Sequence, residues 1–245
     1  MSGTVEVLID NSVCVLTISN PGRKNALSPP LVDDLHAACA RVETDAGISA
    51  VVIQGADGYF CSGADTKYLA DRKAVGADTD NVTRGDATYA SFARLGALPV
   101  PVIAAIRGGA VGAGMNLALA ADVRIVADDA RLMSGFGRIG LHPGGGHAWL
   151  LGRAIGLQGA AAMVLLGDEI SGSRAAELGL AWQALPDESV ESGAAHIARA
   201  TASDPELIRR MTVTLRQSIG PPALPWSAAL DIERTWQLWS LIRRT

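Results

Sequence analysis

The sequence predicts an α/β fold built around buried, largely parallel β-sheets. Runs of β-branched and apolar residues alternate with segments of helical periodicity from the start of the chain to about residue 146. These runs are nearly continuous in apolar residues, which is typical of strands covered on both faces. Apolar residues make up 49% of the chain and charged residues only 19%, below the roughly 25% of an average soluble domain. We therefore expect a large core and further apolar surface buried between subunits.

The N-terminal part predicts a hairpin, a helix and a buried strand. Two β-branched runs, 5–9 and 13–18, flank the turn signal Asp10–Asn11. A helix follows at 31–42, where apolar residues recur on one face, and a strand at 50–53 ends at a glycine.

The rest of the chain predicts alternating elements and then mostly helices. We expect a short helix after Gly63, a polar and poorly periodic stretch at 71–83, helices at 86–95 and 115–121, and strands at 102–106, 123–127 and 180–185. A shift in composition near residue 187 indicates a core of residues 1–186 and a helical C-terminal region of residues 187–245.

Charge and hydropathy exclude two classes of partner. The 21 Lys and Arg against 25 Asp and Glu give a formal charge of -4, so a basic surface for nucleic acid or anionic lipid is not expected. The most apolar region, 95–121, is interrupted by Pro99, Pro101 and Arg107, and its pieces are shorter than the ~20 residues of a membrane span. We predict neither a nucleic-acid nor a membrane partner.

The cysteines indicate a reducing compartment. Cys14, Cys39 and Cys61 are an odd number in a chain long enough to build its own core, so a disulfide framework is not expected. They lack zinc-ligand spacing with a histidine, and no metal site is predicted. Because the N-terminus has no signal-peptide pattern, we predict a cytoplasmic protein.

Two glycine-rich junctions lead from a strand into a helix. The first is Phe60-Cys-Ser-Gly-Ala-Asp-Thr-Lys67, in which Ser62 and Asp65 have the spacing of a capping box, and the second is Gly108-Gly-Ala-Val-Gly-Ala-Gly-Met-Asn116. Glycine lets a ligand approach the backbone, and the first N–H groups of a helix point toward it. Two such junctions could hold one oxygen atom between two N–H donors, as an oxyanion hole does. The alternative is that these glycines serve packing alone.

Other glycine and serine motifs do not match. A dinucleotide fingerprint with Gly112 and Gly114 would need glycine where Leu117 stands, and no Gly-Lys-Ser/Thr of a P-loop follows. Neither Ser62 nor Ser134 lies in a G-x-S-x-G nucleophile elbow, so serine hydrolysis has no motif support.

Four segments together resemble the crotonase superfamily, the enoyl-CoA hydratase/isomerase family. They are 20–28, 60–67, 106–125, and 143–146 with 150–156. The resemblance implies a crotonase-like spiral of ββα units with a C-terminal helical oligomerisation region. It also implies that the ligand is an acyl thioester of coenzyme A and that no cofactor is tightly bound.

The resemblance also implies roles for individual residues. The backbone N–H groups of Ala64 and Ala113 would receive the thioester carbonyl oxygen.

Side chains of the first junction and of segment 20–28, the opening motif, would bind coenzyme A. Ser62 would lie by the adenine, and Lys67, with Arg23 or Lys24 as weaker candidates, would meet the phosphates. The alternative for each cation is an ordinary solvated charge.

The chain departs from the family at the acid and base positions. Family hydratases carry one glutamate two residues after the last glycine of the second junction and another four residues before the glycine that matches Gly140. Here these positions hold Asn116 and Phe136. Neither an amide nor a phenyl ring exchanges a proton at neutral pH, whereas hydration of a double bond needs both a base and an acid.

Several residues are candidates to replace the glutamates. His142 and His147 flank the 143–146 turn, but a lone histidine is more often structural. The acidic residues of the polar stretch, Asp71, Asp78 and Asp80, have a solvated loop as their alternative. Cys61 lies beside the expected hole at a position where the family has a small packing residue.

Three functions remain open from the sequence. The first is an acyl-CoA enzyme, a lyase or isomerase, that stabilises a thioester enolate without the two glutamates. The second is a non-catalytic acyl-CoA binding protein, and the third is a weak enoyl-CoA hydratase that uses another base.

The last helix indicates self-association. Ile232, Trp236, Trp239 and Ile242 recur at helical spacing and form an apolar stripe. With the family resemblance, this predicts a homotrimer or a dimer of trimers, and the alternative is that the stripe packs on its own domain.

Overall fold

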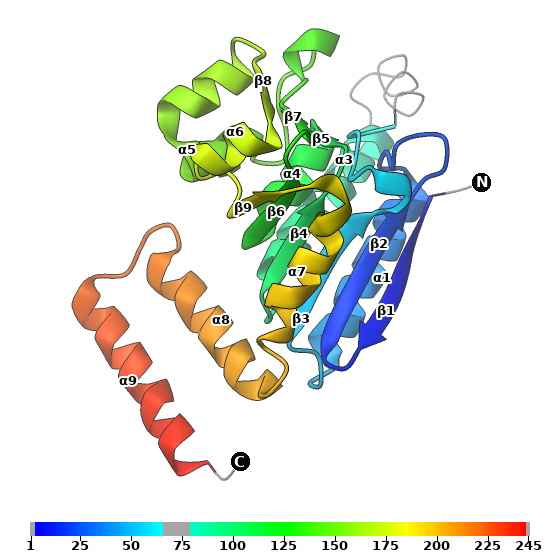
Figure 1. Cartoon of the computed structure of the whole chain (residues 1–245). Coiled ribbons are helices and arrows are strands. Elements are labelled where there is room, and N and C mark those ends of the chain that lie inside the picture. Colours follow the sequence, from blue (N-terminus) through cyan, green and yellow to red (C-terminus); the bar gives the residue numbers. More distant parts are fainter. Residues whose placement is uncertain (1–2, 66–78, 244–245) are drawn as a thin grey trace.

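The computed structural model describes residues 3–65 and 79–243 of the chain. Two β-sheets and their covering helices form the body, and two C-terminal helices extend away from it (Figure 1). Across the described ranges, every helix is too short or too polar to cross a bilayer.

The main sheet confirms the predicted α/β class. Its six strands lie in the order β1-β2-β3-β4-β6-β9, and every neighbouring pair is parallel except the hairpin of β1 and β2. The strands are β1 (Thr4–Asp10), β2 (Val13–Ser19), β3 (Ala50–Gly55), β4 (Val102–Ile106), β6 (Val123–Ala127) and β9 (Gln183–Leu185).

A second, three-stranded sheet was not predicted from the sequence. It has the order β5-β7-β8, with β5 parallel to β7 and β7 antiparallel to β8. Each strand has only three residues, too few for an alternating pattern to be recognised. The strands are β5 (Gly109–Val111), β7 (Arg131–Met133) and β8 (Glu169–Ser171).

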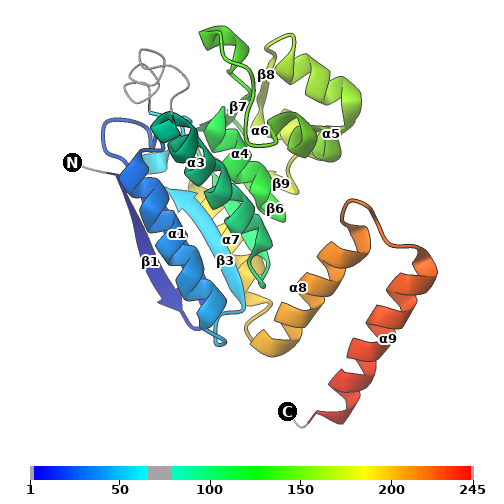
Figure 2. The same ribbon diagram turned by 180° about the vertical axis from the view of Figure 1, so that it is seen from behind.

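Helices cover both faces of the main sheet. α1 (Pro29–Thr44) and α3 (Thr79–Ala97) lie on one face, and α7 (Val190–Arg199) lies on the other (Figures 1 and 2). The central strands β3 and β4 are therefore buried on both faces, as their apolar residues require, whereas β1 at the edge is exposed at alternate residues. The other helices are α4 (Ala113–Ala120), α5 (His147–Val164), α6 (Gly172–Glu177), α8 (Pro205–Ile219) and α9 (Trp226–Ile242), with 3-10 turns η1 (Ala56–Gly58), η2 (Gly137–Ile139) and η3 (Asp187–Ser189).

The first helix follows its sequence signals closely. Pro29 and Pro30 occupy its first turn, where no backbone N–H is needed for the helix. Its predicted apolar face is fully buried: Leu31, Leu35, Cys39 and Val42 are each 0% exposed. The prediction of a helix over 31–42 is confirmed, and the helix extends by two residues at each end.

The start of α3 corrects the prediction. Residues 79–83 were expected to belong to the polar stretch 71–83, but they are helical. The first turn is exposed at Thr79 and Thr83, so it carries no apolar period, and the buried face of the helix begins only further along the chain. Tertiary packing of the later turns supports a helix that local pattern does not indicate. Residues 66–78, which include Lys67, Asp71, Asp78 and the short helix expected after Gly63, lie outside the described residues.

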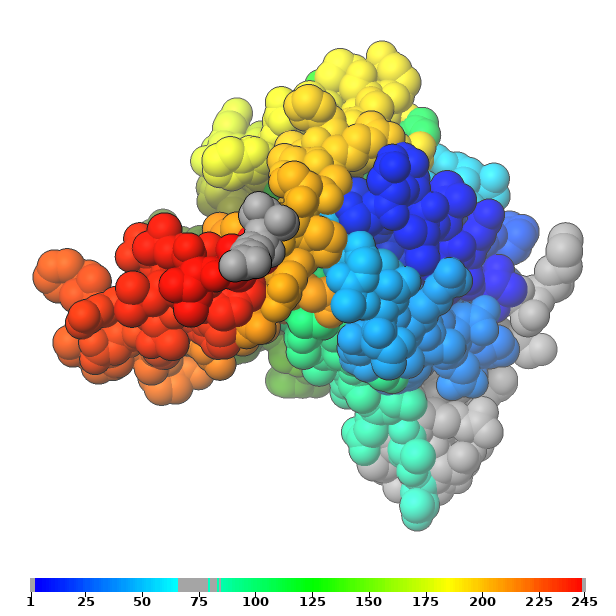
Figure 3. Space-filling view, turned by 90° about the horizontal axis from the view of Figure 1, so that it is seen from below, coloured from blue at the N-terminus to red at the C-terminus, as the bar shows by residue number. Residues whose placement is uncertain are grey.

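The C-terminal pair, α8 and α9, forms an arm (Figure 3). Arg209 in α8 donates to the carbonyl oxygens of Val42, Ile48 and Asp45. Arg216, two turns later, donates to Leu98 O and to the Asp122 carboxylate. These contacts fix α8 to the body, whereas none of the side chains of α9 is buried.

The predicted stripe of α9 packs inside the arm. The rings of Trp236 and Trp239 lie edge to face, with centroids 6.0 Å apart, and the Arg210 guanidinium lies 4.3 Å from the centroid of each. Ile242, the last residue of the stripe, is 81% exposed. The helical region predicted from residue 187 thus contains α7, which covers the sheet, and the arm, which does not.

Candidate active site

The two glycine-rich junctions meet in space. Cys61 N–H donates to Gly109 O at 3.1 Å, and Val111 N–H donates back to Cys61 O at 3.0 Å. These bonds form a short bridge that aligns the first junction with β5. The first junction therefore runs beside the strand that leads into α4.

Glycine is required for this close approach. A Cβ atom at Gly114 would lie 2.3 Å from Cys61 O, and one at Gly63 would lie 2.7 Å from Val111 O. Gly63 also has φ +100°, which L side chains rarely adopt. The same Cβ position of Gly63 is 3.6 Å from Ala113 N, so the residue before Ala64 abuts the first residue of α4.

Ala64 and Ala113 present N–H groups that the fold does not use. Within the described ranges, neither group donates a hydrogen bond. Ala113 is the first residue of α4, where backbone donors have no partner inside the helix and the helix dipole is positive. The structure thus brings the two residues predicted as oxyanion donors to adjacent loops.

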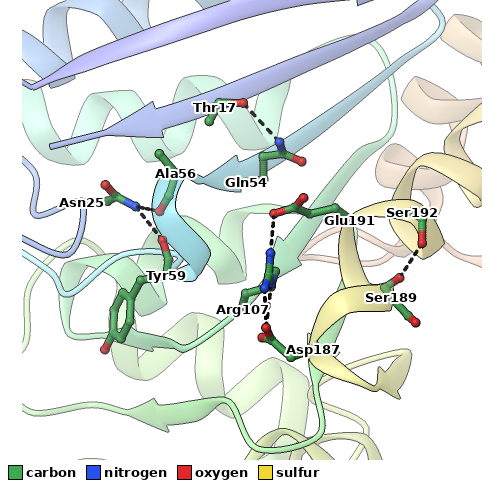
Figure 4. A network of polar contacts seen from close by, with 10 residues as sticks. All are labelled: Thr17, Asn25, Gln54, Ala56, Tyr59, Arg107, Asp187, Ser189, Glu191 and Ser192. Atoms are coloured by element: carbon green, nitrogen blue, oxygen red, sulfur yellow. Dashed lines mark hydrogen bonds and ion pairs between the residues drawn. The ribbon is translucent and has the colours of Figure 1, made fainter. Parts of the chain in front are cut away.

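The opening motif holds the first junction in place. Asn25 Nδ2 donates to Ala56 O at 2.8 Å and to Tyr59 O at 2.6 Å (Figure 4). Leu27 N–H donates to Gly63 O at 2.7 Å, and Asp65 N–H donates to Leu27 O at 3.1 Å. The residues on both sides of Ala64 are therefore hydrogen-bonded to Leu27, whereas the N–H of Ala64 itself has no acceptor among the described residues.

The capping box predicted for Ser62 and Asp65 is not formed. Ser62 Oγ donates to Arg23 O at 2.9 Å, and Asp65 N–H, which the box would use, donates to Leu27 O. The Asp65 carboxylate accepts from Arg23 Nη1 at 3.1 Å. Contacts from the distant opening motif replace the local cap, and spacing alone does not reveal them.

Three of the four residues predicted to bind coenzyme A lie together. Arg23 and Lys24 follow each other on the opening loop, and Ser62 contacts the carbonyl of the first. Lys24 Nζ is 5.0 Å from the centroid of the Tyr59 ring. Lys67 is outside the described residues, and Asp65, two residues before it, pairs with Arg23.

Arg107, which precedes the second junction, fixes it to the helical layer. Its guanidinium donates to Asp187, and Nη1 donates to Glu191 at 3.4 Å (Figure 4). The hydrogen bond from Arg107 lowers the pKa of Asp187 and so keeps this carboxylate charged. The end of β4 is thereby tied to the start of α7.

Asn116 and Phe136, which stand where family hydratases have glutamates, both contact His147. Asn116 is in the first turn of α4 and is 0% exposed. Its Nδ2 donates to Gly144 O at 2.8 Å, and its Oδ1 lies 2.5 Å from His147 Nδ1. The half-buried Phe136 ring meets the His147 ring edge to face at 5.0 Å between centroids.

Ser134 completes a chain of three buried side chains that the sequence motifs do not indicate. Its Oγ lies 2.7 Å from His147 Nε2, and Ser134 and His147 are only 2% and 1% exposed. Burial lowers the pKa of His147 to about 4. His142, the other histidine candidate, is exposed, and its Nδ1 lies 2.8 Å from Pro143 O.

Other reactive groups near the junctions are inert or do not cluster. Cys61 is fully buried, and burial raises the pKa of its thiol to about 12, so it is not a thiolate at neutral pH. In the described part of the chain, no three His, Cys, Asp or Glu side chains gather as metal ligands would.

Comparison with known proteins identifies the family. The sequence profile of the enoyl-CoA hydratase/isomerase family matches residues 8–235. The chain belongs to this family. The resemblance seen in the sequence motifs is therefore confirmed.

Relatives of this chain include proteins named as hydratases and a protein named as an isomerase. The chain is 37% identical to a probable enoyl-CoA hydratase, EchA14, of Mycobacterium tuberculosis, over 88% of this chain and 82% of that protein. It is 34% identical to 1,2-epoxyphenylacetyl-CoA isomerase of Escherichia coli, over 94% of this chain and 87% of that protein.

Solved structures of the family share the fold. An enoyl-CoA hydratase from Polaromonas sp. JS666 superposes with a TM-score of 0.90 at 27% identity, over 98% of this chain and 93% of that one. The crotonase fold, with its C-terminal helices, is thus established for this chain.

Proposed function

We propose that this protein is an acyl-CoA enzyme that stabilises a thioester enolate in an oxyanion hole and works without the two hydratase glutamates. The observation that carries the proposal is that the N–H groups of Ala64 and Ala113, at the meeting point of the two junctions, have no acceptor among the described residues. The thioester carbonyl oxygen would accept both. Each such donor typically contributes ~3–4 kcal/mol to the transition state.

The reaction class follows from which groups can titrate. The Asn116 amide and the Phe136 ring exchange no protons at neutral pH, and hydration needs a base for water and an acid for carbon. The oxyanion hole serves any reaction in which negative charge develops on the thioester oxygen. A lyase or isomerase reaction through an enolate therefore fits these residues better than hydration does.

Arg23, Lys24, Ser62 and Lys67 are the groups we propose for coenzyme A. Arginine and lysine side chains bind phosphate through charge-assisted hydrogen bonds, and the two cations of the opening loop lie beside Ser62. Coenzyme A then enters as part of the substrate and not as a tightly bound cofactor. The cytoplasmic location predicted from the cysteines stays part of this proposal.

A non-catalytic acyl-CoA binder is the second candidate. It is favoured by the hydrogen bonds of Asn116 with Gly144 and His147, which hold a group that does not titrate where family hydratases have a carboxylate. A weak hydratase that uses another base is the third, and it needs a titratable group outside these two positions.

The test is binding and turnover of acyl-CoAs by the protein and by Ala113→Pro. Proline removes the N–H but suits the first position of a helix, so α4 is expected to form. We expect calorimetry to give weaker acyl-CoA binding or a screen of several acyl-CoAs to give 10²- to 10³-fold slower turnover. Ala113→Ser, which keeps the N–H, is the matched control.

Three outcomes separate the candidates. Turnover of any acyl-CoA without hydration supports the enolate enzyme, and tight binding without turnover supports the binder. Equal affinity and rate in the protein and in Ala113→Pro would show that the oxyanion assignment is wrong.

We also propose assembly into a homotrimer or a dimer of trimers through the arm. One face of α9 exposes large apolar side chains. Exposed apolar patches of this kind mark contact surfaces, so we expect another copy of the chain to cover this face. A hollow of about 770 Å³ between α8 and the body is lined by apolar groups that include Trp149, Leu215 and Ile219. The exposed apolar residues of α9 are Trp226, Leu230, Leu238, Leu241 and Ile242.

Light scattering tests the assembly. Leu238→Asp with Leu241→Asp places two charges on the exposed face and is expected to reduce the mass to that of a monomer. The polar neighbour Gln237→Asp adds a charge on the same helix and is expected to leave the mass unchanged. A monomer at micromolar concentration for the unmodified protein would contradict the proposal.

A further inference from the structure

Ser134, His147 and Asn116 come from three separate segments and form one continuous hydrogen-bonded chain. Ser134 follows β7, His147 begins α5, and Asn116 lies in α4. The two links are 2.7 Å from Ser134 Oγ to His147 Nε2 and 2.5 Å from His147 Nδ1 to Asn116 Oδ1. All three side chains are almost completely buried.

The direction of each hydrogen bond is fixed by the Gly144 carbonyl. Because this oxygen can only accept, it faces Asn116 Nδ2 and turns Oδ1 toward His147. Oδ1 then accepts from His147 Nδ1–H, so a neutral imidazole has its lone pair on Nε2. That lone pair accepts the hydrogen of Ser134 Oγ.

The chain lies beside the candidate oxyanion hole. Gly112 N–H donates to Met133 O at 3.1 Å, and a Cβ at Gly112 would lie 3.5 Å from Ser134 O. Gly112 directly precedes Ala113, and Asn116 is one helical turn beyond it. His147 also contacts both positions where family hydratases have carboxylates, through the hydrogen bond to Asn116 and the ring contact to Phe136.

His147 is neutral at physiological pH and can accept a proton. Burial lowers its pKa to about 4. The groups that face it are Asn116 from α4 and Ser134 and Phe136 from the segment after β7, none of which is charged. Tyr89 from α3 packs on the adjoining glycine turn. The site thus holds a neutral base without a buried negative charge.

We propose that Ser134 exchanges a proton with the acyl group in the oxyanion hole and that His147, oriented by Asn116, is the positioning base behind it. This inference rests on the proposed function, because it needs a thioester held at Ala64 and Ala113. In the forward step the Cα–H bond breaks and its electron pair forms the enolate. The proton goes to Ser134 Oγ as the hydrogen of Ser134 goes to His147 Nε2.

The relay holds one proton at a time, and this favours isomerisation over hydration. The imidazolium is buried and uncompensated, so it returns its proton readily. Return to Cα regenerates the substrate, with a solvent deuteron where the relay has exchanged with heavy water, and return to Cγ of an enolate conjugated with a double bond moves that double bond. Within the described residues, the relay has a single titratable group, whereas hydration uses two carboxylates. A 3-enoyl-CoA, whose Cα–H lies between the carbonyl and the double bond, supports this step, so 3-butenoyl-CoA is the probe for the relay.

The experiment is deuterium uptake into 3-butenoyl-CoA in heavy water, followed by mass spectrometry, with its conversion to crotonyl-CoA followed in parallel. Ser134→Ala and His147→Gln are expected to slow both processes at least 100-fold, the usual contribution of an acid/base group. Ser134→Thr, which keeps a hydroxyl, is expected to recover part of the rate. The matched controls are Ser91→Ala, which removes a buried serine of α3, and His142→Gln, which removes an exposed histidine near the same turn.

The pH profile separates a relay from a structural role. His147 accepts a proton only when neutral, so the rate is expected to be constant from pH 8 to about 5 and to fall as the pH approaches about 4. An inflection near 6.5, or a profile that His147→Gln leaves unchanged, would overturn the relay.

Binding measurements keep the two proposals apart. Calorimetry with 3-butenoyl-CoA is expected to give similar affinities for the protein and Ser134→Ala, which also shows that the variant folds. Binding without conversion to crotonyl-CoA, or conversion that survives Ser134→Ala, overturns the relay and leaves the oxyanion hole standing. Release of free coenzyme A with an acyl group on Ser134 also overturns it, because Ser134 then acts as a nucleophile. Absence of binding overturns the proposed function itself.

Discussion

The two halves of the candidate site are built from different parts of the chain. The oxyanion half uses backbone N–H groups, which glycine junctions bring together and which any residue except proline would supply. The proton-transfer half uses the side chains of Asn116, Ser134 and His147, each of which a single substitution changes. A backbone half can therefore persist while the side-chain half acquires other chemistry. The predictions below test this contrast.

The largest effect is expected in hydration. The protein should hydrate crotonyl-CoA at least about 10³-fold more slowly than an ordinary hydratase, because each missing acid or base group accounts for 10² to 10⁴ and paired groups do not add independently. A direct spectrophotometric assay measures this. Asn116→Glu with Phe136→Glu is expected to restore some hydration, although a buried charge at either position lowers stability.

Hydration of crotonyl-CoA at a rate close to that of efficient hydratases would contradict this prediction. It would mean that a residue other than Asn116 or Phe136 supplies the proton chemistry of hydration.

A smaller effect is expected from a carboxylate next to the histidine. Asn116→Asp preserves the shape of the side chain and places a negative charge where Oδ1 now accepts from His147. An opposite charge at this distance raises the pKa of an imidazole by 1–3 units, from the present value of about 4. NMR titration of the histidine resonances measures the shift, and the exposed His142 provides the internal control. An unchanged pKa of His147 would show that the hydrogen bond to residue 116 is absent in solution.

The same histidine predicts how stability depends on pH. Its pKa is about 4 in the folded chain, below the ordinary 6.5, so between these values the unfolded chain binds a proton that the folded chain does not. The free energy of unfolding should therefore fall with decreasing pH by up to about 1.4 kcal/mol per unit across this window. Urea unfolding at several pH values measures it. His147→Gln is expected to flatten this part of the profile, and identical slopes would contradict the burial of a neutral imidazole.

The smallest effect is expected at the rim of the backbone half. Arg23→Ala removes a 46% exposed side chain that pairs with Asp65. We expect at most about a tenfold loss of acyl-CoA affinity, less at high salt, because exposed ion pairs are weak and screened. Calorimetry at two salt concentrations tests this, with Arg174→Ala, an exposed arginine paired with Glu177, as the control. A loss far above tenfold would show that side chains also dominate this half.

The sequence predicted the elements with a strong local period and the junctions with strong turn chemistry. The hairpin, α1 and the parallel strands followed from apolar patterns, and the approach of Gly63 and Gly114 to neighbouring carbonyls explains the glycines on which the oxyanion prediction rested. The strands β5, β7 and β8 were missed because three-residue strands have no period. The first turn of α3 was missed because its sequence has no apolar period, and Thr79 and Thr83 are exposed.

The side-chain half could not be derived from the sequence because its members are brought together only by tertiary structure. Ser134 lies 13 residues from His147, and His147 lies 31 residues from Asn116. Ser134 has no motif of its own, and the histidines on the two sides of the glycine turn look alike in sequence. Burial distinguishes them: His147 faces inward and His142 is exposed.

The N–H groups of Ala64 and Ala113, which have no acceptor among residues 3–65 and 79–243, have a consequence for hydrogen exchange. Amides without an acceptor lack the protection that helix and sheet bonds give, so these two should exchange with solvent deuterium faster than their bonded neighbours Leu27 and Val111. A thioester oxygen that accepts both would slow them together. Occupancy of the site then becomes visible in the protein itself, for any acyl chain and whether or not a reaction follows.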